Sequence, residues 1–139
     1  MIRFLAGEKG VGKTKHLIDM ANVAAKTTDG DLVFIEKGRR HIYDLHYNIR
    51  FVETASYPIS NYREFIGFLC GVLSQNNDIE EIYVGGLNKI IKTLSSEDLV
   101  KLISKLENLS AENEVNFTMT LNWRVDDLPE EVKPLLLSE

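Results

Sequence analysis

Residues 7–14 read Gly-Glu-Lys-Gly-Val-Gly-Lys-Thr and match the spacing G-x-x-x-x-G-K-[ST] at every defined position. Its glycines allow tight, partly left-handed turns that bring backbone N–H groups close to a phosphate. Lys13 can reach β- and γ-phosphates as a point charge, and the Thr14 hydroxyl can ligate Mg²⁺. A helix that begins near Gly12 directs its positive end at the same anion. We therefore predict a nucleotide-phosphate site formed by Gly7, Glu8, Lys9, Gly10, Val11, Gly12, Lys13, Thr14 and Lys15.

The segments on either side of this loop suit that role. Residues 1–6 form a short, mostly apolar run, which predicts a buried strand. Residues 13–26 carry apolar side chains at helical spacing, namely Leu17, Met20, Ala21, Ala24 and Ala25. The predicted order of strand, glycine-rich loop and helix is the one that the motif requires.

Length and composition indicate an ordinary globular domain. The chain has 139 residues, 44% of them hydrophobic and 27% charged, and we expect one domain over residues 1–139. Its single cysteine, Cys70, excludes an intramolecular disulfide and a cysteine zinc site, and we expect it to be a small core residue. No apolar run approaches ~18 residues and no signal peptide is visible, so we expect a cytoplasmic protein without a membrane-spanning helix.

Strand and helix patterns alternate along the remaining chain. Strands are predicted over residues 32–36, 49–54, 81–85 and 115–122, with the second of these at a sheet edge. One helix is expected after Ser60 as N-cap and another after Ser95, with Asp98 completing its first turn. A short final helix is expected over residues 128–137, and residues 37–46 are expected to form a loop or a short helical turn.

This alternation predicts an α/β fold, with a mainly parallel five-stranded sheet between helices on both faces. In such sheets ligands lie at the carboxyl ends of the strands. Candidate site residues should therefore follow directly after each strand, in residues 7–14, 36–40, 54, 85–88 and 122–124.

The order of elements resembles the RecA-like P-loop NTPases. The phosphate loop is followed by V-F-I-E, then by I-Y-V-G-G-L where the family has its Walker B strand, and finally by F-T-M-T-L-N. The resemblance covers nearly the whole chain and implies the strand order 3-2-4-5-1. It also implies ATP and Mg²⁺ as the bound cofactors.

The sequence departs from that family where Walker B should carry an aspartate, because Gly85 holds the position. Glu80 and Glu81 begin the same strand and should lie ~13 Å from its functional end. The resemblance places a catalytic carboxylate near Glu36, which ends the second strand, although a contact with Mg²⁺-bound water or with the loop is an alternative. Nucleotide binding is thus predicted, together with slow or absent hydrolysis.

The last predicted strand ends in Asn122, Trp123 and Arg124. Asn122 resembles a sensor residue that binds the attacking water or the γ-phosphate. Arg124 could neutralise γ-phosphate charge, and Trp123 could stack on adenine. The alternatives are that Trp123 covers a helix edge and that Arg124 pairs with Asp126 or Asp127.

Residues 37–50 contain a cluster of basic side chains, Lys37, Arg39, Arg40, His41, His46 and Arg50. They suit either a solvated loop or a patch for an acidic partner, a phosphate or single-stranded nucleic acid. The net charge of −5 argues against nucleic acid as an obligate partner. The apolar residues 135–137 could dock on the core or contact a second subunit.

Three functions are compatible with these features. The first is an ATP-binding P-loop protein, a weak or inactive ATPase that acts as a nucleotide-dependent regulator or assembly factor. The second is a small P-loop kinase, as some tetrameric thymidine kinases share the RecA-like core. The third is a non-enzymatic interaction module that keeps the loop for folding or for a structural phosphate.

Overall fold

The structure is a computed structural model that describes residues 1–10 and 12–137. Five strands alternate with helices along this part of the chain. The strands are β1 (Ile2–Gly7), β2 (Asp31–Glu36), β3 (Ile49–Glu53), β4 (Ile79–Gly85) and β5 (Asn116–Asn122). The α-helices are α1 (Lys13–Thr27), α2 (Tyr62–Ser74), α3 (Leu87–Ile90) and α4 (Ser96–Asn113). Short 3₁₀ turns are η1 (Ile42–Asp44), η2 (Val125–Asp127) and η3 (Lys133–Leu135).

All neighbouring strands in the sheet are parallel, and their order is β1-β5-β4-β2-β3. Counted from the β3 edge, this is the order 3-2-4-5-1 that the resemblance implies. The predicted edge position of the strand at residues 49–53 is also confirmed. Because the strands are parallel, the carboxyl ends of β1, β5, β4 and β2 lie at one edge of the sheet, as predicted.

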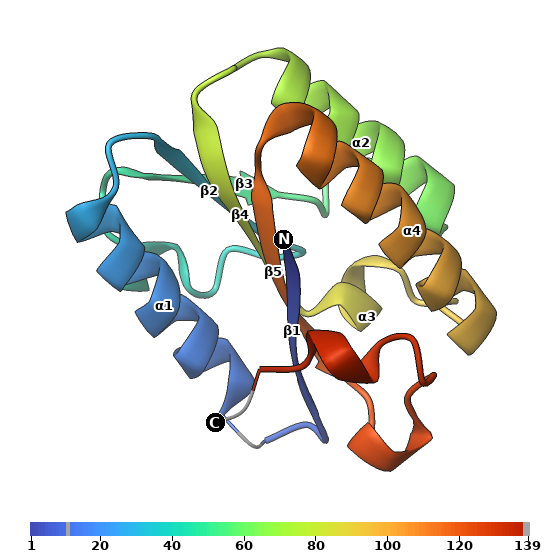
Figure 1. Cartoon of the computed structure of the whole chain (residues 1–139). Helices are drawn as coiled ribbons and strands as arrows, with labels where there is room; N and C mark the ends of the chain where they lie inside the picture. The colour runs from blue at the N-terminus through green and yellow to red at the C-terminus, as the bar shows by residue number, and fades with distance from the viewer. Residues whose placement is uncertain (11, 138–139) are drawn as a thin grey trace.

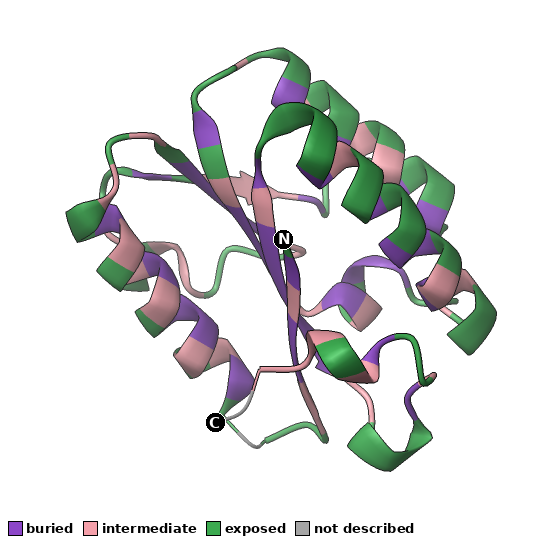
Figure 2. Ribbon diagram, viewed as in Figure 1, coloured by how far each residue is buried: buried purple, intermediate pink, exposed green. Residues whose placement is uncertain are grey.

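Helices cover both faces of the sheet, with α1 on one side and α2 and α4 on the other (Figure 1). Two sets of apolar side chains fill the spaces between the layers. Phe34 and Tyr83 face α1, where they meet Leu17, whereas Phe117 belongs to the larger cluster beneath α2 and α4. Figure 2 shows this burial as purple stripes on the helix faces that are turned toward the sheet. Burial on both faces explains why the central strands are almost continuously apolar.

Two predictions about α2 were wrong. The N-cap of α2 is Asn61, whose side chain accepts a hydrogen bond from the Glu64 N–H, while Ser60 donates to the Glu64 carboxylate. Cys70 is exposed, because it lies on the outer face of α2, one position beyond the buried Leu69.

The C-terminal segment is not the helix expected over residues 128–137. Pro134 has no backbone N–H to donate, which disfavours an α-helix there, and only the short turn η3 forms. Beyond η3, Leu136 bridges to Phe4 on the otherwise free edge of β1, and the Leu137 N–H donates to the Phe4 carbonyl at 2.8 Å. Of the two predicted alternatives, this segment therefore docks on the core.

Two further features complete the fold. The helix α4 begins after Ser95, whose hydroxyl accepts from the Asp98 N–H, and this confirms the predicted cap. Within residues 1–10 and 12–137, no helix has both the length and the apolar character that a membrane crossing requires.

Candidate functional site

The phosphate loop, residues 7–14, joins β1 to α1 and has the backbone that its glycines predict. Gly10 and Gly12 have φ angles of +94° and +83°, in the left-handed region that favours glycine. Gly12 is the N-cap of α1 and has no side chain that could accept the first N–H groups of the helix. The predicted residue Val11 lies outside the described residues. The described geometry suits an anion at the start of α1.

Lys13 points back across the loop. Its side chain is 5% exposed, and its Nζ atom donates hydrogen bonds to the carbonyl oxygens of Gly7 at 3.0 Å and of Glu8 at 2.9 Å. Thr14 follows in the first turn of α1 and is half-buried, while Lys9 and Lys15 are exposed. The ammonium group is therefore held within the curve of the loop.

The end of β5 lies directly beside the loop. Asn122 is the register partner of Gly7, and the Trp123 N–H donates to the Gly7 carbonyl at 3.1 Å. The Asn122 N–H donates to the side-chain oxygen of Asn88, which lies on α3, at 2.9 Å. The structure thus brings Asn122 next to the loop and fixes its backbone from a neighbouring element. Trp123 is partly buried and packs against the larger core cluster.

Glu36 ends β2 directly opposite Gly85, which ends β4. A Cβ atom placed on residue 85 would lie 2.9 Å from the Glu36 Cγ and 3.2 Å from its Oε2. The Glu36 carboxylate therefore occupies the space in which a side chain of residue 85 would begin. The position that lacks the expected acid is filled by an acid from the neighbouring strand.

The environment of Glu36 changes its acidity. Its carboxylate lies 3.1 and 3.2 Å from the His41 Nδ1, with 13% of the side chain exposed. Burial raises the pKa of Glu36, while His41, Lys89 and Arg40 act in the opposite direction. The raised pKa means that burial is the stronger influence on this carboxyl.

Arg124, which follows β5, contacts the phosphate loop through Glu8. Its Nε lies 3.7 Å from the Glu8 carboxylate and 3.9 Å from that of Asp127, and 63% of the side chain is exposed. The contact with Asp127 is one of the predicted alternatives for Arg124, whereas the contact with Glu8 is not among them. At these distances and exposures the ion pairs are weak, so the guanidinium can exchange partners at little cost.

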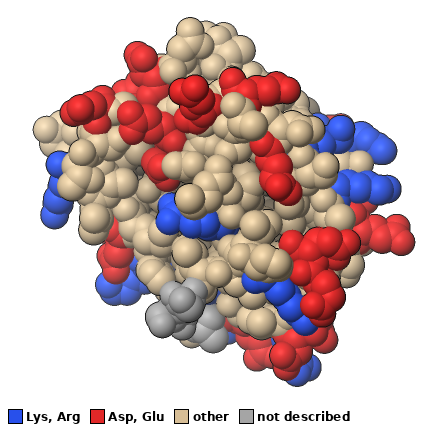
Figure 3. Space-filling view, in the orientation of Figure 1, with Lys and Arg blue, Asp and Glu red and all other residues tan. Residues whose placement is uncertain are grey.

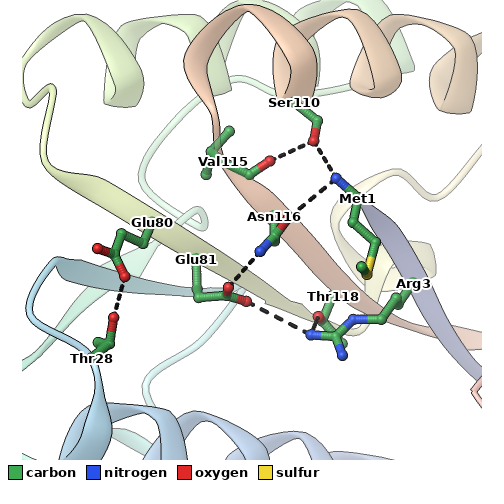
Figure 4. A network of polar contacts seen from close by, with 9 residues as sticks. All are labelled: Met1, Arg3, Thr28, Glu80, Glu81, Ser110, Val115, Asn116 and Thr118. Carbon is green, nitrogen blue, oxygen red and sulfur yellow. Dashed lines mark hydrogen bonds and ion pairs between the residues drawn. The ribbon is translucent and has the colours of Figure 1, made fainter.

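The other acids of β4 lie away from the phosphate loop, as their place at the start of the strand predicts. Glu81 contacts Arg3 and accepts a hydrogen bond from Asn116, within a network that also joins the N-terminal ammonium group to Ser110 (Figure 4). Glu80 is hydrogen-bonded to Thr28. Both carboxylates are thus engaged at the beginning of the strand, opposite the end that Gly85 forms.

The basic residues of the segment 37–50 make different contacts. His41 turns inward to Glu36, whereas Lys37 lines a cavity with Lys89 and Lys92. The Asn22 side chain fastens the loop to α1, because it donates to the Asp44 carbonyl and accepts from the His46 N–H. The aromatic rings of Tyr43 and Tyr47 remain 97% and 89% exposed.

Sequence reasoning missed the neighbours that orient these residues. Asn88 lies in the segment singled out after β4, but nothing in its residue type pointed to Asn122. The sequence indicates His41 as a member of a basic cluster and gives no sign of its contact with Glu36, five positions away. Both contacts depend on how two loops meet at the sheet edge, which the local sequence does not encode.

Comparisons with known proteins place this geometry in a known fold. No protein-family model matches the chain, and no curated protein matches it either. Among solved structures, it superposes on a KaiC-like protein, PH0186, from the hyperthermophilic archaeon Pyrococcus horikoshii OT3, with a TM-score of 0.67 and 17% sequence identity. The match covers 96% of this chain and 66% of that structure, so the chain spans just under two thirds of its length. From the strand order, the loop geometry and this superposition, we conclude that the chain has the RecA-like P-loop NTPase fold.

Proposed function

We propose that this chain binds ATP with Mg²⁺ through residues 7–15, hydrolyses it slowly or not at all, and acts as a nucleotide-dependent regulator or assembly factor. The observation that carries the proposal is the pairing of a complete phosphate loop with a β4 strand that ends in glycine. A glycine can neither ligate Mg²⁺ nor orient its bound water, so the usual organisation for rapid hydrolysis is incomplete.

Lys13 is the residue on which binding depends most. Its ammonium group is already held by two loop carbonyls, at 2.9 and 3.0 Å. A phosphate in the loop would exchange those neutral acceptors for charged oxygens, and hydrogen bonds to charged acceptors are roughly twice as strong. Preorganisation of the lysine reduces the entropy lost on binding.

The residues present suit a magnesium ion that is held mainly by nucleotide phosphates. Bound Mg²⁺ would withdraw electron density from the phosphate oxygens. Thr14 would supply a hydroxyl ligand, and the Glu36 carboxylate, in the space beside Gly85, would accept hydrogen bonds from metal-bound water. Asn122 and Arg124 flank the loop and would contact the γ-phosphate.

Association with a protein partner or with a second copy of the chain would connect the bound nucleotide to a biological output. The fold neighbour is longer than this chain, so its additional segments offer no guide to that partner. We propose a cytoplasmic location, where ATP is present.

The decisive experiment is a calorimetric titration of Mg-ATP into the wild-type protein and into Lys13→Ala. We expect the substitution to weaken binding by about tenfold to a hundredfold, which is the loss of one charge-assisted hydrogen-bonding group. Lys26→Ala is the matched control, because it removes an exposed lysine from the last turn of the same helix. Equal affinity of Lys13→Ala and wild type would refute the proposal and favour a non-enzymatic interaction module.

A further inference from the structure

A cavity opens near the phosphate-loop edge of the sheet, beyond the carboxyl ends of β2 and β3. Its volume is about 360 Å³, within the range of small-molecule sites. Residues from three segments line it, namely Lys37 after β2, residues 54–60 after β3, and residues 89–93 at the end of α3. We call it the lysine cavity.

Lys37, Lys89 and Lys92 give this cavity a positive charge, and none of the described residues that line it is acidic. The Glu36 carboxylate, which does not line the cavity, interacts electrostatically with Lys89. Within the part of the chain that the structure describes, none of the three forms an ion pair within 4.0 Å. Lys92 lies so close to Lys37 that it lowers the pKa of the Lys37 ammonium group. Neighbouring ammonium groups repel each other, and a bound anion would offset that repulsion.

The charge is unusual for this molecule. The chain carries a net charge of −5, and acidic side chains are spread over the face shown in Figure 3, with lysine and arginine in smaller groups between them. A local concentration of three lysines around one cavity is therefore not a reflection of overall composition. It indicates a place where the protein would attract an anion.

The remaining walls of the lysine cavity are suited to an organic group. Ile59 and Ile90 supply apolar surface, and the Tyr57 ring packs against Phe68 with ring centroids 5.4 Å apart. Thr54 is buried and adds a hydroxyl group at the cavity wall. A few polar groups on an apolar wall are typical of sites that bind small molecules.

Backbone and side-chain hydrogen bonds fix these walls. The N–H groups of Thr54 and Ala55 donate to the carbonyls of Glu36 and Lys37 at 2.9 and 3.0 Å, which continues the β2–β3 ladder beyond the strands. The Thr93 hydroxyl donates to the Ser60 carbonyl at 3.2 Å and joins the α3 side to the β3 side. The cavity is thus part of the ordered framework.

We propose that the lysine cavity binds a small organic molecule through a phosphate monoester group. Lysine ammonium groups bind phosphate as point charges, whereas a carboxylate is better matched by the planar fork of arginine. A single aromatic ring lines the cavity, whereas sites for single-stranded nucleic acid use a series of stacking rings. The site is separate from the phosphate loop and does not depend on ATP binding.

Phenyl phosphate is a suitable probe, because it joins the proposed anion to a ring of the size of the apolar wall. We would titrate it into isotopically labelled protein and follow backbone amide resonances by NMR. The titration is done in the wild type and in Lys13→Ala, so that binding at the phosphate loop is recognised separately. We expect concentration-dependent shifts in residues 54–60 and 89–93 of both proteins.

Variants then test the lysines. The double variant Lys37→Ala/Lys92→Ala should bind phenyl phosphate about tenfold or more weakly than the wild type, since charged hydrogen bonds are lost. Lys101→Ala/Lys105→Ala removes the same charge from the exposed face of α4 and should leave affinity within about twofold, because screened distant charges contribute little. Benzoate should bind more weakly than phenyl phosphate.

Four results would overturn the proposal. They are shifts confined to residues 7–15, equal affinity of the two double variants, preference for benzoate, or no shift in residues 54–60 and 89–93 at millimolar probe. Tighter binding of a thymidine oligonucleotide at the same residues would assign the cavity to nucleic acid instead. If the wild-type protein fails to bind Mg-ATP, this inference still stands. The probe titration of Lys13→Ala tests the lysine cavity, whose lining residues are not those of the phosphate loop.

Discussion

The phosphate loop at the end of β1 and the β2–β4 pair lie at the same edge of the sheet, yet they differ in how their residues are assembled. In the loop, consecutive residues form the site, and Lys13 bonds to carbonyls only five and six positions away. At the β2–β4 pair, Glu36 fills the space beside Gly85, 49 positions along the chain, and is held by His41.

This contrast separates anion binding from the chemistry that would follow it. Anion binding in the loop needs only local backbone geometry and one ammonium group, and the described loop residues supply both. The acid at β2–β4 is partly desolvated, and this burial raises the pKa of Glu36 more than the neighbouring His41 and Lys89 lower it. We infer that the first region determines whether nucleotide binds and the second determines what magnesium contributes.

The largest effect that would sharpen the comparison is expected for Glu36→Gln. If Glu36 receives hydrogen bonds from magnesium-bound water, the gain in ATP affinity on adding Mg²⁺ should fall by about tenfold, as for other outer-shell partners. Calorimetry with and without Mg²⁺ measures that gain. Glu53→Gln is the matched control, because Glu53 is the register partner of Glu36 on β3. An equal loss in both variants would show that general charge, not position, is responsible.

A smaller effect is expected where Glu36 and Gly85 meet. Gly85→Ala would bring a Cβ atom to 2.9 Å from the Glu36 Cγ, so one of the two must move. In urea unfolding of Gly85→Ala, Glu36→Ala and the double variant, we expect a coupling energy of about 1 kcal/mol, because removal of the Glu36 side chain relieves the crowding. Additive free energies of unfolding would mean that the two positions do not compete for space.

The raised pKa of Glu36 predicts a pH dependence of stability. The folded protein holds this proton to higher pH than the unfolded chain, whose pKa is near the ordinary value of 4.5. Stability from this group is therefore present below that pH and is lost as the pH rises through the folded pKa. The free energy of unfolding of wild type relative to Glu36→Gln should fall over this interval. A difference that stays constant or grows in urea unfolding at successive pH values would contradict the predicted direction.

The smallest effect is expected for Arg124→Ala. Its contacts with Glu8 and Asp127 are 3.7 and 3.9 Å long and largely exposed, so the free energy of unfolding should change by less than about 0.5 kcal/mol. If Arg124 turns to the γ-phosphate, affinity for ATP should fall by about fivefold while affinity for ADP is unchanged. Arg124→Lys, which keeps the charge, is the control. Equal changes for ATP and ADP would place the arginine away from the γ-phosphate.

Residue patterns predicted the strands well because the buried faces of a parallel sheet require long apolar runs, such as Leu32–Ile35. They failed where a single local detail decides the outcome. Asn61 rather than Ser60 caps α2, and Pro134 prevents a final helix, which leaves Leu136 to pair with the edge of β1. At the first site two neighbouring residues were chemically acceptable as caps, and at the second a single proline outweighed the helical spacing of its neighbours.

The amino-acid sequence by itself determined the phosphate loop, since positive φ angles at Gly10 and Gly12 and the start of a helix are properties of a few adjacent residues. It also showed that β4 ends without an acid. Only the tertiary structure decided that Glu36 fills the space beside Gly85 and that Lys37 and Lys92 line one cavity. The physical reason is that strand register and loop docking bring together residues that are far apart in the chain, and those contacts depend on the whole sheet.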